Sequence, residues 1–74
     1  MGKLRVLSGR EVCQILSDRG FVEVRQRGSH IIMQLKTNER TITVPIPNHK
    51  ELKMGTLKSI IRQSNLPRDL FELQ

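Results

Sequence analysis

Hydrophobic and polar positions along the chain follow two different periods. Over residues 8–19 the apolar side chains recur at the spacing of a helix with one buried side. Ser8 and Glu11 form a capping-box pattern at its start, and Gly20 is a typical residue just beyond a helix end. We therefore predict a first helix over 8–19 whose buried side carries Val12, Ile15 and Leu16.

A second helical pattern covers residues 56–65, after a polar loop over 48–55. Thr56 is the predicted cap of this helix, because a hydroxyl can accept a hydrogen bond from a free backbone amide. Its buried side carries Leu57, Ile60 and Ile61. Pro67 can then start a short final turn of helix, since proline suits the first helical position.

Between the helices, polar and apolar residues alternate with the period of β-strands. Turns are expected at Gly28 and over 37–40, and Pro45 and Pro47 are expected to end the last strand. The three predicted antiparallel strands cover residues 21–27, 30–36 and 41–46. Alternation gives the sheet one apolar face, to which we assign Val22, Val24, Ile31, Met33, Leu35, Ile42, Val44 and Ile46.

This order of elements predicts an α+β domain in which both helices pack on the apolar face of the sheet, followed by a short C-terminal helical turn. The opposite face is left to solvent or to a ligand. Strand parity places His30 on that open face, on the side of Gln34 and Lys36. Arg25 or Arg27 of the neighbouring strand is then close to His30.

The composition is that of one small basic domain spanning residues 1–74. A net charge of +6 favours nucleic acid or another polyanion as the partner. Cys13 is the only cysteine, which excludes a disulfide within the chain and a Cys/His zinc cluster, and fits a reducing cytoplasm. No apolar run approaches the roughly 20 residues of a membrane span. Trp and Tyr are absent, which argues against an aromatic platform for stacking bases.

His30 is the candidate catalytic residue, because an imidazole can accept or donate a proton near neutral pH. A lone histidine is more often a solvated side chain, but the basic neighbours favour chemistry on an RNA phosphodiester. A neutral imidazole can take the proton of a 2′-hydroxyl, which then attacks its own phosphate. Nearby cations stabilise the charge that grows on the phosphate oxygens. This chemistry needs no metal ion and no small-molecule cofactor.

RNA-binding residues are expected beside His30 and in the loop that follows the third strand. Ser29, next to the turn, can hydrogen-bond the backbone or a phosphate. His49 can shape its loop, contact substrate or protonate the leaving oxygen, a role that a lysine or water could also fill. The candidate RNA-binding set is Arg25, Arg27, Ser29, Lys36, His49 and Lys50.

An ordered set of short motifs extends over most of the chain. Its members are Ser8-Gly9 with Glu11, Gly20-Phe21, Arg25-Gln26-Arg27-Gly28-Ser29-His30, Val44-Pro45, Glu51-Leu52, Gly55-Thr56-Leu57 and Ile60-Ile61. This set resembles the HicA toxin family, the small mRNA interferases of type II toxin–antitoxin pairs. The resemblance implies a fold like that of double-stranded-RNA-binding domains, with His30 catalytic. It also implies mRNA cleavage and inhibition by a HicB-type antitoxin that covers the His30 face.

The sequence is therefore consistent with three candidate functions. The first is a metal-independent toxin ribonuclease that uses His30. The second is a non-catalytic RNA-binding module with the same basic face, which would tolerate loss of His30. The third is an interaction protein whose positive surface only docks an acidic partner, and which would not bind RNA at low salt.

Overall fold

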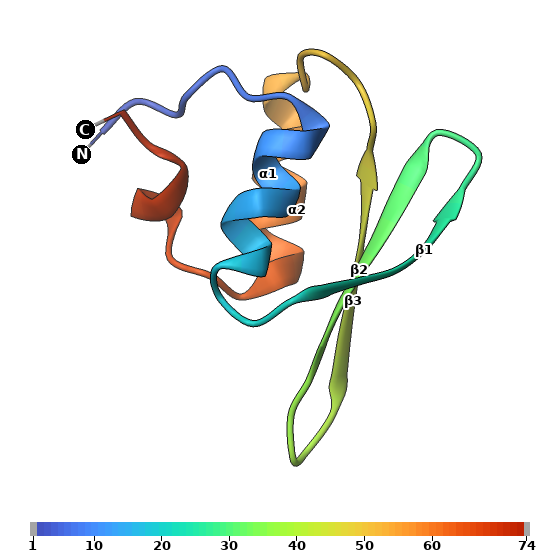
Figure 1. Ribbon diagram of the computed structural model, residues 1–74. Helices are drawn as coiled ribbons and strands as arrows, with labels where there is room; N and C mark the ends of the chain where they lie inside the picture. The colour runs from blue at the N-terminus through green and yellow to red at the C-terminus, as the bar shows by residue number, and fades with distance from the viewer. Residues whose placement is uncertain (1, 74) are drawn as a thin grey trace.

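The computed structural model, which describes residues 2–73, folds as a helix, an antiparallel sheet, a second helix and a short 3-10 turn (Figure 1). The sheet has three strands in the order β1-β2-β3. The predicted α+β fold, similar to that of double-stranded-RNA-binding domains, is confirmed. The elements are α1 (Gly9–Ser17), β1 (Val22–Arg27), β2 (His30–Lys36), β3 (Thr41–Pro47), α2 (Met54–Ser64) and η1 (Arg68–Phe71).

The predicted capping box fixes the start of α1. The Ser8 Oγ accepts a hydrogen bond from the Glu11 amide at 3.0 Å, and the Glu11 Oε1 accepts one from the Ser8 amide at 2.8 Å. Two amides that the helix itself cannot satisfy are thereby paired. The helix ends at Ser17, and Gly20 follows with a φ of 97°, a backbone conformation that suits glycine.

The second helix begins earlier than its sequence pattern predicts. Lys53 is the N-cap residue, and it makes no side-chain capping bond. The amide of Leu57 donates to the Lys53 carbonyl at 3.0 Å, so the first turn closes ahead of Thr56. The prediction that Thr56 caps the helix was therefore wrong. At the other end, Asn65 adopts the left-handed conformation that ends many helices.

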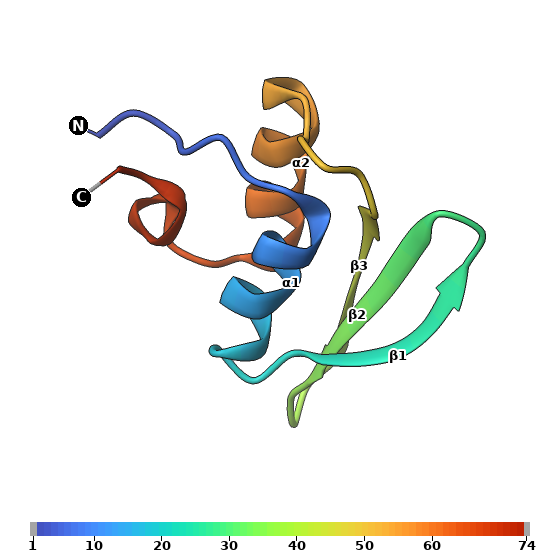
Figure 2. The same ribbon diagram turned by 45° about the horizontal axis from the view of Figure 1, so that its top comes forward.

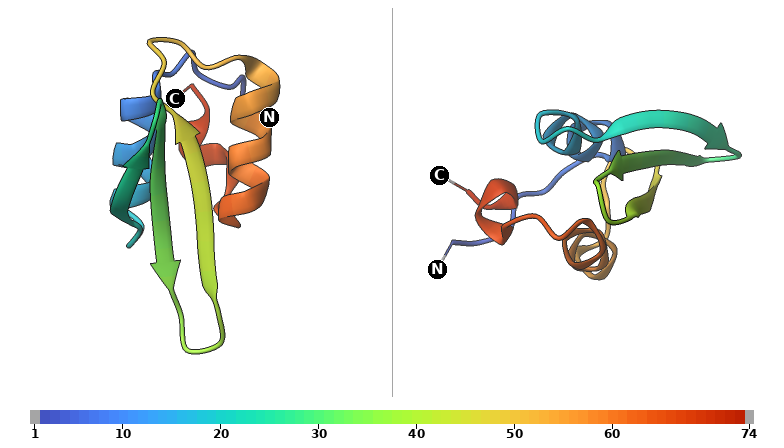
Figure 3. Two further views of the ribbon diagram at one scale, coloured as in Figure 1. Left: turned by 90° about the vertical axis from the view of Figure 1, so that its right-hand side faces the viewer. Right: turned by 90° about the horizontal axis from the view of Figure 1, so that it is seen from below.

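Both helices lie on the same side of the sheet, as predicted (Figures 2 and 3). They enclose the core between themselves and the inner faces of β2 and β3. The N-terminal segment and the C-terminal tail close the far side, because the Arg5 amide donates to the Phe71 carbonyl at 2.8 Å. The most deeply buried large side chains are Phe21, Phe71, Leu7, Leu16, Ile31, Ile46 and Leu57.

Strand β1 departs from the predicted alternation. Val22 and Val24, which we assigned to the apolar face, are 59% and 42% exposed. Val22 is opposite Gln34, and a β-bulge between Glu23 and Arg25 changes the parity of the residues that follow. Glu23, not a valine, faces the helix layer, so the prediction that Val22 and Val24 lie on the apolar face was wrong.

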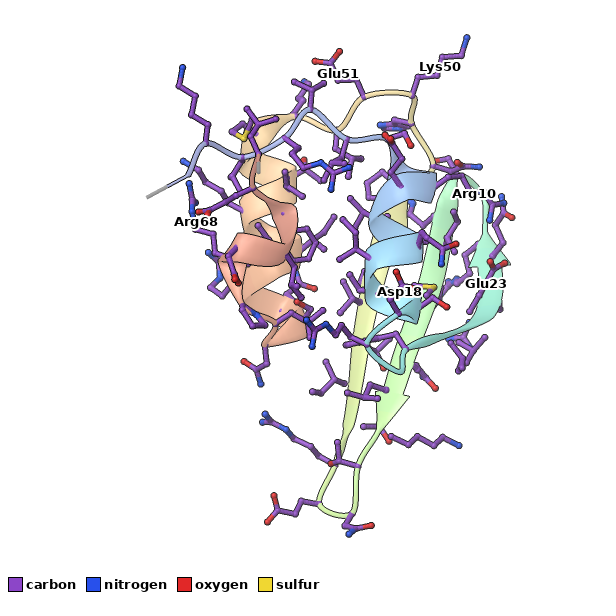
Figure 4. All side chains as sticks on the ribbon, turned by 60° about the vertical axis from the view of Figure 1, so that its left-hand side comes forward. Arg10, Asp18, Glu23, Lys50, Glu51 and Arg68 are labelled. Atoms are coloured by element: carbon purple, nitrogen blue, oxygen red, sulfur yellow. The ribbon has the colours of Figure 1, made fainter. Side chains whose placement is uncertain are left out.

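The physical reason is an ion pair between this edge strand and α1. Glu23 is opposite the buried Met33, and its carboxylate meets the Arg10 guanidinium of α1 at 3.4 Å (Figure 4). The inner side of β1 is therefore covered by a polar contact. A single bulge residue, Val24, then returns Arg25 and Arg27 to the outer face.

Strand β3 continues through the two prolines that were expected to end it. Pro45 is opposite Ile32 and Pro47 is opposite His30. A strand at the edge of a sheet tolerates proline when the ring nitrogen lies on the free side. The result is that both prolines become part of the surface around His30.

Candidate functional site

Strand pairing sets the surroundings of His30. His30 is the first residue of β2, directly opposite Arg27 of β1 and Pro47 of β3. Two residues further along, Ile32 is opposite Arg25 and Pro45. The structure thus confirms the predicted open side for the histidine and both arginines.

We call the sheet surface that faces away from the helices the open face. The pairing of the three strands assigns to it Val22, Arg25, Arg27, His30, Ile32, Gln34, Lys36, Thr41, Thr43, Pro45 and Pro47. Within this set are three permanent cations and no carboxylate. The open face is therefore a positively charged surface suited to a polyanion.

A groove of about 540 Å³ crosses one end of the open face. Ile32 lies in it and is only 7% exposed, although it points away from the core, because its cross-strand neighbours cover it. His30 and the two arginines are exposed around this apolar residue. The lining residues are Arg25, Arg27, His30, Ile32, Thr43 and Pro45.

The two arginines of the groove have no acidic partner in the described part of the chain. Over residues 2–73 the ion pairs of the structure are Arg10–Glu23 and Arg68–Glu72. The guanidinium groups of Arg25 and Arg27 are therefore available to an anion. Arginine binds phosphate well because its planar fork can donate two hydrogen bonds at once.

A two-residue turn holds Arg27 and His30 opposite each other. Gly28 has a φ of 56°, whereas Ser29 has no positive φ. Glycine with positive φ at the first central position is the signature of a type II′ turn, whose twist matches that of the flanking strands. The Ser29 carbonyl accepts a hydrogen bond from the Asn48 amide at 2.6 Å, which fastens the turn to the loop after β3.

The first turn of α1 supports this loop from behind. The Gly9 amide donates to the His49 carbonyl at 2.9 Å. A side chain at Gly9 would overlap the Pro47 carbonyl oxygen, so the helix backbone packs directly on the end of β3. Gly9 thereby helps to position Pro47, the cross-strand neighbour of His30.

The structure brings together only part of the predicted RNA-binding set. Ser29 and His49 lie at the His30 end of the sheet but do not line the groove. Lys50 points outward from its loop (Figure 4). Lys36 is on the open face at the far end of β2, about 20 Å from His30 at roughly 3.3 Å per residue.

Sequence reasoning did not identify Thr43 and Pro45 as groove residues. Alternation indicated the direction of Thr43, but only the pairing of β3 with β2 shows that both residues lie beside Ile32. Thr43 and Pro45 are two residues apart, which predicts that both lie on the same face of the strand. That spacing does not give the cross-strand partner.

No cluster of three or more His, Cys, Asp or Glu side chains in residues 2–73 could hold a metal ion. Cys13 is buried in the core, and desolvation raises the pKa of its thiol. No helix in the described part of the chain has the length and apolar character to cross a bilayer.

Comparison with known proteins places the chain in a family. The family model described as the HicA toxin of bacterial toxin–antitoxin systems matches residues 9–66. This span runs from the start of α1 to just beyond α2 and includes the whole sheet. No curated protein matches the chain. With most of its length matched by this model, the chain belongs to the HicA family of toxins.

Proposed function

We propose that this toxin is an endoribonuclease that cuts mRNA at the groove of the open face. The observation that carries the proposal is the placement of His30 beside Arg25 and Arg27, two cations without acidic partners. A proton-transfer group next to groups that bind phosphate is the minimum needed for transesterification of RNA. Membership of a toxin family supports the proposal, because destruction of mRNA arrests growth.

The proposed reaction uses RNA's own nucleophile. The neutral imidazole of His30 accepts the proton of a 2′-hydroxyl as its oxygen bonds to the adjacent phosphorus. The bond from phosphorus to the 5′-oxygen breaks, and that oxygen takes up a proton. The products are a 2′,3′-cyclic phosphate and a free 5′-hydroxyl. No metal ion or other cofactor takes part.

Arg25 and Arg27 are proposed to stabilise the charge of the reacting phosphate. Negative charge on the phosphate oxygens grows as the reaction proceeds, and the two neighbouring guanidinium groups stabilise it. The proton for the leaving oxygen can come from water or from a second side chain. His49 is the second histidine to test, because the preceding residue, Asn48, is hydrogen-bonded to Ser29 at the same end of the sheet.

We also propose that a HicB-type antitoxin inhibits the toxin by covering the open face around His30. The three cations and the lack of carboxylates on that face favour a partner with acidic contacts there. Both mRNA and such a partner would be met in the cytoplasm, where we expect the toxin to act.

The test of catalysis compares wild-type protein with His30→Ala on a long unstructured RNA in excess EDTA. We expect wild type alone to cut, leaving 2′,3′-cyclic phosphate ends, and the same sequence as DNA to remain intact. Circular dichroism checks that the variant is folded, as expected for an exposed position. Equal cutting by both proteins would contradict a role for His30. RNA binding without cutting by wild type would favour the non-catalytic RNA-binding module.

The test of phosphate binding measures the salt dependence of RNA affinity for Arg25→Ala/Arg27→Ala. Both proteins compared carry His30→Ala, so that the RNA stays intact. Each phosphate contact contributes about 0.7 to the slope of log affinity against log salt for single strands, so the double variant should lose about 1.4. The control is Lys58→Ala/Arg62→Ala, which removes the same charge from exposed positions on α2. Equal loss of slope in both double variants would show that only net charge matters.

A further inference from the structure

The open face continues well beyond the groove. Strands β2 and β3 remain paired as far as Lys36 and Thr41, and their hairpin projects past the ends of both helices (Figures 1 and 4). Arg25 and Arg27 lie at the His30 end of this surface, and Lys36 lies at the other end. The stretch between the charged ends is neutral.

The neutral stretch carries one polar pair. The Gln34 Nε2 donates a hydrogen bond to the Thr43 Oγ1 at 3.2 Å across the two strands. In the described part of the chain the Gln34 Oε1 accepts no hydrogen bond, and the second Nε2 hydrogen is free. A cross-strand bond of this kind holds the amide in one orientation while leaving a donor and an acceptor side by side.

We propose that the open face is a track for single-stranded RNA, in which Gln34 reads one base between the groove and Lys36. The inference rests on the proposed function and extends it to the form of the substrate. Three strands about 4.8 Å apart give a surface about 10 Å wide as far as Gln34, which suits one strand of nucleic acid, and β2 and β3 alone continue it to Lys36. In an RNA duplex the narrow major groove keeps a glutamine amide from the base edges, whereas the bases of a single strand leave these edges accessible.

The structure sets a length for the bound segment. His30 and Lys36 are about 20 Å apart along β2. At a stacked rise of 3.4 Å this distance spans about six nucleotides, and a stretched strand needs fewer. A dinucleotide is too short to contact both ends of the track at once, even when it is stretched.

The first experiment measures binding of uridine oligonucleotides of 2 to 12 nucleotides (roughly one-third to twice the estimated span) by fluorescence anisotropy. All proteins carry His30→Ala, so that the RNA stays intact. Lys36→Ala should leave the shortest oligonucleotides unaffected and weaken those of about six or more, with a salt slope lower by about 0.7. Lys58→Ala on α2 is the matched control and should change neither. Identical length profiles for the two variants would overturn the track.

The second experiment maps cleavage sites of the active protein across a long RNA by sequencing the new 5′ ends. We expect a base preference at one fixed distance from the cut, on the order of fivefold, that Gln34→Ala abolishes. Gln63→Ala is the matched control, because Gln63 also donates its amide to a hydroxyl, that of Ser59, but on α2. An unchanged preference in Gln34→Ala would refute the assignment of this residue.

These experiments separate the two proposals. If the protein cuts no RNA while Lys36 still matters only for long oligonucleotides, the ribonuclease is refuted and the track stands as a binding surface. If the protein cuts RNA while Lys36→Ala and Gln34→Ala behave as their controls do, the ribonuclease stands and the track is refuted.

Discussion

Replacement of Gly9 by alanine tests how the first helix supports the site. The added Cβ would overlap the Pro47 carbonyl oxygen and lie 3.1 Å from the Asn48 Cα. Both neighbours are backbone atoms, so the end of β3 must retreat by on the order of 1 Å to restore a normal contact. That movement strains two hydrogen bonds, Gly9 to His49 at 2.9 Å and Asn48 to Ser29 at 2.6 Å.

The expected cost follows from these contacts. Overpacking against a rigid neighbour costs about 1–3 kcal/mol, and each weakened hydrogen bond adds up to about 1 kcal/mol. Alanine returns about 0.5–1 kcal/mol through its better helix propensity. The net loss of about 2–3 kcal/mol should lower the Tm of this small domain by roughly 10–20 °C. Because Pro47 is the cross-strand neighbour of His30, the folded variant should also cut RNA more slowly.

Thermal unfolding followed by circular dichroism measures the loss, and cleavage assays well below the Tm measure the effect on the site. Gly55→Ala is the matched control, because Gly55 also lies in the first turn of a helix but a Cβ there meets no atom within 4 Å. This control should raise the Tm slightly through helix propensity alone. If Gly9→Ala were as stable as wild type, the close packing of α1 on β3 would not hold.

Three further predictions concern the turn, the cap and the core. Gly28→Ala should lower the free energy of unfolding by about 1 kcal/mol, because a φ of 56° is strained for an L-residue. The added Cβ itself meets no atom within 4 Å. A Tm equal to that of wild type would contradict the strained turn. Hydrogen bonds from Ser8 hold the pKa of Glu11 below its ordinary 4.5, so its ionised form stabilises the fold above that pH and loses this effect as the pH falls through the lowered pKa. The Tm difference between wild type and Glu11→Gln should therefore close in acid, and a constant difference from pH 7 to about 3 would argue against it. Burial raises the pKa of the Cys13 thiol, so a thiol reagent should label it slowly at pH 8 and quickly in urea; fast labelling of the native protein would show that the core opens there.

Much of the fold can be predicted from patterns of residues that are close together in the chain. The capping box at Ser8 and Glu11, the positive φ at Gly20 and the turn at Gly28 depend on contacts or conformations within a few residues. The alternation of β2 and β3 is similarly local, because successive side chains point to opposite faces of a strand. The open side of His30 could therefore be predicted before any tertiary contact was known.

In strand β1, alternation along the sequence does not predict which side chains are buried. Its sequence alternates as regularly as that of β2, yet Val22 and Val24 are exposed and Glu23 faces α1. The bulge that decides this depends on the pairing with β2 and on the Arg10 side chain that the helix presents. Neither can be deduced from the residues of the strand itself.

The sequence by itself determined the order of elements, the sheet with one open side, the basic character of that side and the histidine on it. The alternation along the chain predicted Arg25 or Arg27 close to His30, and only the tertiary structure decided that both share a site with it and that Lys36 does not. Arg25 and Arg27 do so because β1 pairs with β2, whereas Lys36 is on the same face about 20 Å away. Distance across a sheet depends on register, and register depends on contacts between segments that are separate in the chain.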